Sequence, residues 1–309
     1  MFKRIVVPLD RTECASAILP IARALAARTG GTLALLHVID HHHPSADLAD
    51  QQRRDARQWL REIARESGLH GQTSAIIAIR NGSPAEEILT YADEIEADSI
   101  CMATHGRAGL TRVVVGSVAE RVLHRTHLPL LLVRPDVAIA DLSTHAPIVV
   151  PLDGSPRAEA ALPQAVILAK ILGAPLTLVR VWNATLPTLP GPYAIAMDQR
   201  MFDEMEEATE GIAAAYLHTI AARLANEVAV QTACLHGDTT EQLTAYLRTE
   251  RPSLVVMGAH GRGGVPRWVM GSVASELIRA AITPVLLIGD AYVRATAQIA
   301  DAAETITAR

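Results

Sequence analysis

The chain contains one long sequence pattern twice, and this repeat restricts its fold more than any other feature. Three pairs of matching blocks carry the repeat: residues 5–10 and 148–153, 104–107 and 259–262, and 116–119 and 271–274. The members of the first pair lie 143 residues apart (148 − 5), and those of the other two lie 155 residues apart (271 − 116). Solenoid repeats span only about 20–50 residues, so a spacing of this size indicates a duplicated domain.

The spacing between the blocks also predicts the domain boundaries. We expect a first domain at residues 1–140 and a second at 141–309, with a linker near residues 136–147. Because the spacing grows by 12 residues (155 − 143), the second domain must contain an insertion. The Pro- and Gly-rich run 186–193 is the expected place for it, as a loop before a long helix.

Each half alternates short apolar runs with amphipathic segments, which predicts an α/β fold. In the first half the expected strands are residues 4–9, 32–39, 73–79, 99–103 and 130–133. Hydrophobic residues make up 50% of the chain and aromatic residues only 3%, so Val, Ile, Leu and Ala must fill the core. That filling is typical of a parallel sheet with helices on both faces. Pro20 and Pro163 fall at equivalent places within predicted helices, and we expect each to kink its helix.

Charge and composition exclude several classes of protein. The net charge of −5 leaves no basic footprint for nucleic acid, and no uncharged apolar window is long enough to span a membrane. A strand pattern begins almost at the N-terminus, which leaves no room for a signal peptide. Cys14, Cys101 and Cys234 are widely spaced, as expected for reduced core thiols of a cytoplasmic protein. Neither Lys3 nor Lys170 follows a glycine loop, so the sequence has no Walker phosphate loop.

The recurring blocks are strand ends and glycine turns, which are the places where parallel α/β sheets bind ligands. In the second half Gly258, Gly261 and Gly271 follow a predicted strand, and Ser272 begins a predicted helix. Glycines allow a backbone to approach a ligand closely, and free amides at a helix N-terminus favour an anion. Asp153, at the end of another strand, is suited to accept ribose hydroxyl groups. This combination predicts a nucleotide site beyond the strand ends.

The pattern Gly-x2-Gly-x9-Gly-Ser, after a Val-Val-Met strand and downstream of a Pro-Leu-Asp strand end, resembles that of the universal stress protein family. The chain is most similar to the ATP-binding branch in its tandem form, over residues 1–135 and 146–290. The resemblance implies two flavodoxin-like domains, each a five-stranded parallel sheet of order 3-2-1-4-5 with helices on both faces. It also implies binding of ATP, with or without Mg²⁺, little or no hydrolysis, and a regulatory role in stress survival or dormancy.

Carried over residue by residue, the resemblance implies one nucleotide site in each half. The matching residues of the second half are Asp153 on the ribose side, Val181 beside the adenine, and Gly258, Gly261, Gly271 and Ser272 at the phosphates. Those of the first half are Asp10, Val38, Gly106, Gly116 and Ser117, with Ala103 in the place of the first glycine. Arg107 and Arg262 directly follow loop glycines and are candidates for a γ-phosphate contact.

The alanine in the first half predicts that the two sites differ in affinity. If the backbone of Ala103 is ordinary β structure, its extra methyl group is tolerated. If that position needs a positive φ, the alanine costs about 1 kcal/mol of strain. In either case we expect both domains to bind ATP and the first domain to bind it more weakly.

Several alternatives accompany this interpretation. His105 and His260 occupy equal places in the glycine loops, and we favour a structural role for them over a phosphate contact. The run His41–His43 has no spaced partner, so we interpret it as a solvated loop and expect no metal site. A nucleotide-using enzyme, with slow ATPase or adenylate-transfer activity, is the alternative function, although no paired carboxylates or positioned lysine suggest a general base. A stress scaffold without a ligand is the third.

The fifth strand of each domain lies at a sheet edge in the expected strand order. The apolar residues 130–133 would invite pairing unless they were covered, and the equivalent residues 285–288 offer that cover. We therefore expect the two domains to pack around these strands as an internal pseudo-dimer. Further assembly into a homodimer is compatible with this arrangement.

Overall fold

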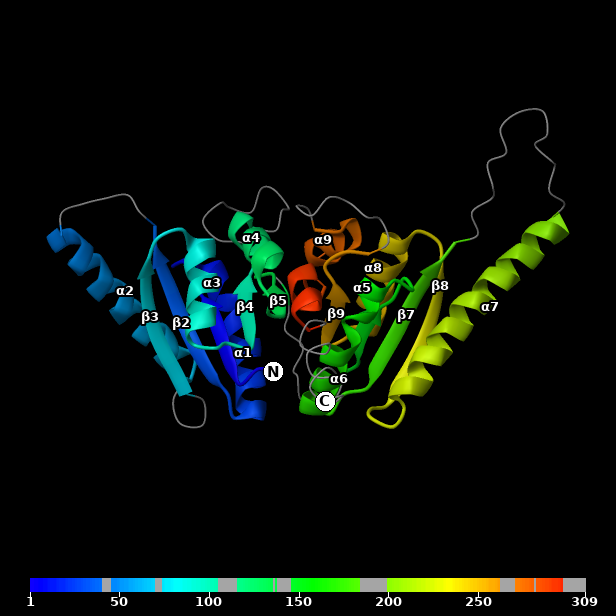
Figure 1. Cartoon of the computed structure of the whole chain (residues 1–309), viewed down its shortest axis with the longest axis horizontal. Coiled ribbons are helices and arrows are strands. Elements are labelled where there is room, and N and C mark those ends of the chain that lie inside the picture. Colours follow the sequence, from blue (N-terminus) through cyan, green and yellow to red (C-terminus); the bar gives the residue numbers. More distant parts are fainter. Residues whose placement is uncertain are drawn as a thin grey trace, which may run out of the picture.

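Ten strands form one sheet that runs through the whole molecule (Figure 1). The computed structural model describes residues 1–40, 46–69, 74–104, 116–135, 137, 146–183, 199–261, 270–280 and 282–296. The strand order is β3-β2-β1-β4-β5-β10-β9-β6-β7-β8. Within each half the pairs are parallel and the order is 3-2-1-4-5, which confirms the predicted fold.

The elements of the first half follow the predicted alternation of strand and helix. Its strands are β1 (Arg4–Pro8), β2 (Thr32–Ile39), β3 (Ser74–Asn81), β4 (Ser99–Ala103) and β5 (Leu130–Val133). Its helices are the 3-10 helix η1 (Glu13–Ile18), α1 (Leu19–Thr29), α2 (Ala46–Glu66), α3 (Pro84–Glu94) and α4 (Ser117–Arg125). The strands therefore begin and end within two residues of the expected positions.

The second half repeats this succession. Its strands are β6 (Ile148–Pro151), β7 (Leu176–Trp182), β8 (Val230–His236), β9 (Leu254–Gly258) and β10 (Val285–Ile288). Its helices are α5 (Pro156–Glu159), α6 (Leu162–Leu172), α7 (Gln199–Leu224), α8 (Thr239–Glu250) and α9 (Ser272–Arg279), and residues 290–296 are also helical. Among the helices that the structure describes, none combines the length and the apolarity that crossing a membrane requires.

The two halves meet at the centre of the sheet, where β5 and β10 pair antiparallel. Leu131 faces Leu286 across this pair, and Leu130 faces Leu287. All four side chains are fully buried. The expectation that the two fifth strands cover each other's edges is therefore confirmed.

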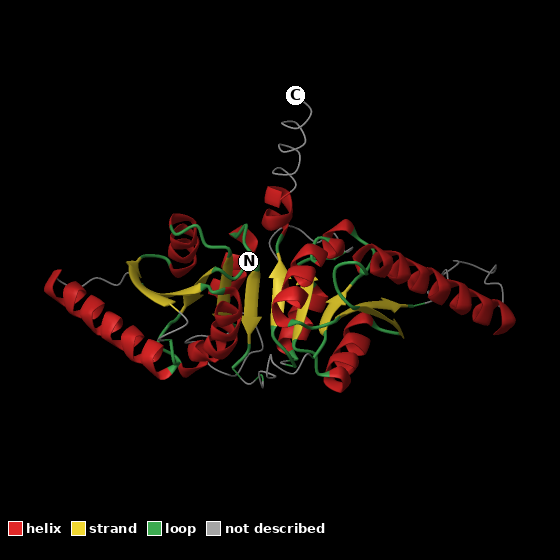
Figure 2. Ribbon diagram, turned by 90° about the horizontal axis from the view of Figure 1, so that it is seen from below, coloured by secondary structure: helices red, strands yellow, loops and turns green. Residues whose placement is uncertain are grey.

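Alternating strand residues divide the core between the two faces of the sheet, which Figure 2 shows with helices on both sides. Helices α1, α2, α6 and α7 pack on one face, and α3, α4, α8 and α9 pack on the other. In β5, for example, Leu131 and Val133 belong to the first cluster, whereas Leu130 and Leu132 belong to the second. Each cluster contains residues of both halves, so the apolar packing is continuous across the β5–β10 junction.

The helix after the first strand of each half departs from expectation, because it is divided into two helical segments whose junction residues keep right-handed backbone dihedrals. In the first half η1 ends at Ile18 and α1 begins at the next residue, with Pro20 in its first turn. In the second half α5 ends before α6, and Pro163 lies in the first turn of α6. A proline lacks an N–H, and the first turn of a helix leaves those groups unused, so each proline begins a helix there.

The insertion in the second half lies between β7 and β8. The predicted loop 186–193 is outside the described residues. Part of the extra length lies in the long helix, because α7 has 26 residues and its counterpart α2 has 21. These two helices lie at the opposite ends of the molecule (Figure 1).

Candidate functional site

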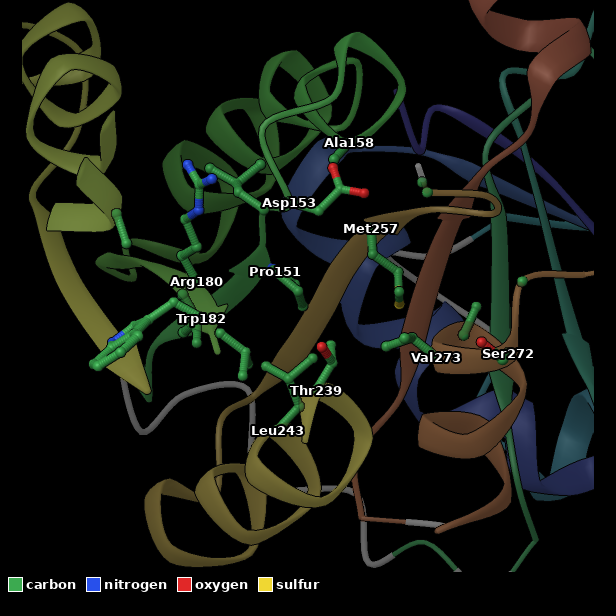
Figure 3. A pocket seen from close by; sticks show the side chains of 18 of the residues that line it. Pro151, Asp153, Ala158, Arg180, Trp182, Thr239, Leu243, Met257, Ser272 and Val273 are labelled. Atoms are coloured by element: carbon green, nitrogen blue, oxygen red, sulfur yellow. The ribbon is translucent and has the colours of Figure 1, made fainter. Parts of the chain in front are cut away.

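A cavity of about 460 Å³ lies at the carboxyl ends of the strands in the second half. It collects residues that are far apart in the sequence, from β6, β7, β9, α7, α8 and the start of α9. Six residues predicted from the sequence line it: Asp153, Val181, Gly258, Gly261, Gly271 and Ser272. Figure 3 shows Asp153, Thr239, Met257 and Val273 around the same hollow. Arg262, the seventh candidate of this half, lies outside the described residues.

Asp153 enters the cavity from the turn after β6. The N–H of Ser155 donates to its Oδ1 at 2.8 Å, and Ser155 Oγ in turn accepts from the N–H of Ala158 at 3.2 Å. Gly154, between them, has a φ of 82°, a conformation that glycine adopts without strain. We call the segment between Gly258 and Gly271 the glycine loop. A Cβ on Gly261 would lie 2.7 Å from Asp153 Oδ2, so the start of this loop passes close to the carboxylate.

Gly258 ends β9, and its requirement for glycine is steric. It is not among the described residues with positive φ. A Cβ at this position would lie 2.8 Å from the carbonyl oxygen of Arg157, in the short helix α5. The absent side chain thus lets the backbone after β6 pack against the end of β9. The glycine at this position is therefore required by close packing and not by a positive φ.

At its C-terminal end, Gly271, the glycine loop is hydrogen-bonded to a residue at its N-terminal end. The N–H of Gly271 donates to the carbonyl oxygen of Ala259 at 2.9 Å, and a Cβ would lie 3.0 Å from that oxygen. Helix α9 begins at the next residue, and no described side chain caps it. Because Ser272, Val273 and Ala274 line the cavity, the uncapped N–H groups of this first turn lie at its wall. Such a helix end favours a negatively charged group.

The opposite wall contains residues that we did not predict from the sequence. Arg180 and Trp182 flank Val181 on β7, and both line the cavity. The Arg180 guanidinium lies 4.6 Å from the centre of the Tyr216 ring, and Trp182 stacks on His236 with ring centres 4.3 Å apart. Their position beside Val181, at the end of a strand, is the signal that could have identified them.

Tyr216 supports this wall from α7. Its hydroxyl donates to Glu159 at 3.1 Å, which ties α7 to α5. Burial, together with the Glu159 carboxylate, raises the pKa of Tyr216 to about 12, so the hydroxyl stays protonated and remains a donor at neutral pH. The cavity wall between α5, α7 and Arg180 is therefore fixed by neighbouring side chains.

The first half reproduces the same framework with different residues. Oδ1 of Asp10 accepts from the N–H and the hydroxyl of Thr12, at 3.1 and 2.6 Å. Gly116 donates to the carbonyl oxygen of Thr104 at 2.7 Å, as Gly271 does to Ala259. Arg11 stands where the second half has Gly154, with a φ of 66°, and Ala103 ends β4 where Gly258 ends β9.

The remaining candidates of the first half divide into two groups. Val38 lies near the end of β2, and Ser117 begins α4, so both occupy the positions that correspond to Val181 and Ser272. Gly106, Arg107 and His105 lie outside the described residues, as does the run His41–His43. Among the described residues, no group of three or more His, Cys, Asp or Glu side chains could hold a metal ion.

The prediction of buried thiols is correct for one of the three cysteines. Cys101, on β4, is fully buried, whereas Cys14 and Cys234 are half-buried. None of the three forms a disulfide. The apolar run placed Cys101 in a buried strand, whereas Cys14 lies in the 3-10 helix η1 and Cys234 lies on the edge strand β8.

Known proteins resemble both the sequence and the fold. A model of the universal stress protein family matches residues 1–134 and 145–289. The universal stress protein Rv2005c of Mycobacterium tuberculosis is 29% identical over 193 residues, which are 62% of this chain and 62% of that protein. The match therefore spans less than two thirds of that relative's length. MJ0531 of Methanocaldococcus jannaschii, also a universal stress protein, is 28% identical over 145 residues, 43% of this chain and 83% of that protein.

A solved structure has the same fold over almost the whole chain. The crystal structure of a universal stress protein from Archaeoglobus fulgidus gives a TM-score of 0.67, with 19% sequence identity. The alignment covers 94% of this chain and 97% of that chain. At this identity the similarity concerns the fold alone.

Proposed function

This chain belongs to the universal stress protein family, and we propose that it is a regulatory protein that binds ATP, with its main site in the second domain. The observation that carries the proposal is the single cavity that places Asp153 opposite the uncapped first turn of α9. A carboxylate suited to ribose hydroxyl groups and a helix end suited to phosphate thus lie at one site.

The glycines give the site a backbone surface suited to phosphate. At Gly258, Gly261 and Gly271 a Cβ would approach another atom to 3.0 Å or less, so a side chain is excluded at each of these three positions. Peptide groups can therefore come close to a phosphate chain, with Ser272 as an additional donor. Val181 and the apolar side chains of Leu243 and Met257 offer a surface for the flat face of a base. The cavity volume lies in the range of small-molecule sites.

Binding without rapid hydrolysis fits the side chains of the cavity. Asp153 is the only carboxylate among the described residues that line it. One oxygen of Asp153 already accepts the Ser155 N–H. His260, the histidine among the described lining residues, has its Nδ1 3.7 Å from Asp290 Oδ1, so both candidate general bases already face neighbouring groups of the protein. We propose that the bound nucleotide acts as a signal in a stress response and is not a rapidly consumed substrate.

The first domain should bind the same ligand more weakly. Ala103 has a methyl group at the position where Gly258 has none, and at Gly258 such a group would lie 2.8 Å from the carbonyl oxygen of Arg157. Arg11 adopts a left-handed conformation that costs a non-glycine residue about 1–2 kcal/mol, and its guanidinium lies 5.6 Å from the centre of the Trp59 ring. The turn after Asp10 therefore contains a strained arginine that packs on Trp59, whereas the turn after Asp153 contains an unstrained glycine.

Calorimetric titration of the full-length protein with ATP tests the proposal. Because the cores of the two domains are continuous, the sites are best separated by substitution in the intact chain. Asp153→Ala and its counterpart Asp10→Ala remove one carboxylate from each site and are matched controls for each other. We expect Asp153→Ala to abolish the tighter binding event and Asp10→Ala to leave it intact.

Two results would contradict the proposal. No heat of binding, together with no nucleotide detected by mass spectrometry in the freshly purified protein, would exclude ATP binding. A greater loss of affinity in Asp10→Ala than in Asp153→Ala would place the main site in the first domain. Release of phosphate at many turnovers per minute would favour the alternative of a nucleotide-using enzyme.

A further inference from the structure

Asp290 lies behind the glycine loop of the second domain and close to both segments that form it. It is the first residue of the helical segment that follows β10. Its Oδ1 lies 3.8 Å from Nε of Arg157 and 3.7 Å from Nδ1 of His260. The carboxylate is about one-quarter exposed, so its attraction to the Arg157 guanidinium is only partly screened by solvent, and its contact with His260 is an ion pair only when the imidazole is protonated.

The Arg157 partner connects Asp290 with the end of β9. The carbonyl oxygen of Arg157 is the atom that a Cβ on Gly258 would approach to 2.8 Å. A displacement of the Arg157 backbone would therefore change the close packing between its carbonyl oxygen and Gly258. The Arg157 side chain is about half exposed, so the Asp290 contact restrains the side chain of a residue whose backbone packs against the start of the glycine loop.

The His260 partner connects Asp290 with the loop itself. His260 stands between Ala259 and Gly261, lines the cavity, and has a side chain that is only 9% exposed. The loop beside it passes over Asp153, because a Cβ on Gly261 would lie 2.7 Å from that carboxylate. The orientation of the His260 ring therefore affects the backbone that faces the ligand.

Asp290 is itself held in place by the first domain. The preceding Gly289 packs so closely on α4 that a Cβ would lie 3.0 Å from the carbonyl oxygen of Leu123. On the same helix, the ring of His124 lies 6.3 Å from the ring of His260. The region behind the glycine loop is therefore an interface between the two domains.

The first domain lacks the corresponding charges. By the repeat spacing, Pro135 occupies the place of Asp290 (290 − 155), and Cys14 occupies that of Arg157 (157 − 143). An ion pair between these two positions is chemically impossible. The carboxylate support is therefore a feature of the second domain, which is the domain with the glycine at the end of its fourth strand.

We propose that Asp290 is a positioning residue that sets the phosphate-facing conformation of the glycine loop, acting through Arg157 and His260. The inference rests on the proposed nucleotide site. It predicts that the carboxylate contributes to the binding of the phosphates and not to the binding of the nucleoside, because Arg157 packs against the end of β9 at Gly258 and His260 lines the cavity beside Gly261.

Calorimetry on the full-length protein with ATP and with adenosine provides the test. Asp290→Asn removes the charge and preserves the shape, and we expect it to weaken ATP binding at the tighter site about three- to fivefold while adenosine affinity stays unchanged. Asp290→Glu should retain most of the ATP affinity. Arg157→Gln should weaken ATP binding in the same direction, and the double variant should lose less than the sum of the two effects.

A matched control is Glu276→Gln, which removes the exposed ion pair between Glu276 and Arg279 on α9 and should change neither affinity. Equal ATP affinity in the wild type and Asp290→Asn would overturn the inference. So would an equal loss for ATP and adenosine, because that pattern indicates a general structural effect. If the wild type binds neither ligand, the proposed function itself fails, and that result is distinct from both of these.

Discussion

Glycine residues in this chain have different physical roles, and their neighbours reveal which role each one has. Gly258 has no positive φ, but the carbonyl oxygen of Arg157 occupies the space in which a side chain would lie. Gly211, within the exposed face of α7, has no atom within 4 Å of its Cβ position. The same substitution should therefore have opposite effects at these two positions.

We expect Gly258→Ala to destabilise the protein by about 1–3 kcal/mol, because the new methyl group forces the backbone near Arg157 to move. Gly211→Ala should instead stabilise it by about 0.5–1 kcal/mol, since alanine loses less conformational entropy than glycine in a helix. Urea unfolding of both variants measures the two values. Equal changes of the same sign would contradict the close packing at Gly258.

Cys101 should make the stability of the protein depend on pH in the alkaline range. Burial, and to a smaller degree the nearby Asp98 carboxylate, raises the pKa of this thiol well above its ordinary value of 9.0. In the unfolded chain the thiol ionises near that ordinary value, so above it the native state binds more protons than the unfolded state. The free energy of unfolding must then fall as the pH rises.

Between pH 9 and 10 this effect can reach about 1.4 kcal/mol per pH unit for one proton. Cys101→Ala removes the thiol, so the slope of unfolding free energy against pH should become smaller over this range. Below pH 8 the slopes of the two proteins should agree, which serves as the internal control. An unchanged slope at pH 9–10 would show that the buried thiol does not titrate as described.

Helix α8 brings Thr239 and Leu243 to the cavity, and a single side chain caps its first turn. Oδ1 of Asp238 accepts the N–H groups of Thr240 and Glu241, both at 3.0 Å. A carboxylate at this position also interacts favourably with the helix dipole. The Asp238 cap thus stabilises the first turn of α8, which carries Thr239 and Leu243 of the cavity wall.

Asp238→Ala should lower the free energy of unfolding by about 1 kcal/mol, because two backbone donors lose their acceptor. Asp238→Asn retains a side-chain oxygen and should cost clearly less. Thermal or urea unfolding measures both variants. If asparagine cost as much as alanine, the charge and not the hydrogen bonds would determine the stability of this helix end.

The prolines show how element boundaries can be misjudged from a sequence. Equivalent prolines at 20 and 163 lie inside long amphipathic patterns, which favours one kinked helix in each half. The structure has two shorter helices, and each proline lies in the first turn of the second one. The apolar pattern continues across the break because both helices pack on the same face of the sheet, so periodicity alone cannot show it.

At the scale of the whole molecule, the two domains share one sheet and both core clusters. Charged residues at the β5–β10 junction should therefore unfold both domains together. Leu131→Asp and Leu287→Asp each bury an unpaired carboxylate, and we expect a loss of more than about 4 kcal/mol with a single loss of structure. Calorimetry and small-angle X-ray scattering measure the stability and the compactness of these variants.

The outer edge of the sheet offers the matched control. Ile76, on the edge strand β3, is 48% exposed, so Ile76→Asp should cost less than about 1 kcal/mol. If Leu131→Asp retained the stability and compactness of the wild type, the two domains would not depend on this junction. Two separate thermal transitions in the wild type would likewise contradict a shared core.

The sequence by itself determined the duplication, the alternation of strands and helices and the residues at the strand ends, whereas the strand order was an implication of the family resemblance. The first three features depend on local patterns: apolar runs form buried strands, and glycines and aspartates end them. Only the tertiary structure decided why Gly258 is a glycine and where Arg180, Trp182 and Asp290 lie relative to the loop. Each of these depends on contacts between segments far apart in the chain, whose distances and directions no local pattern encodes.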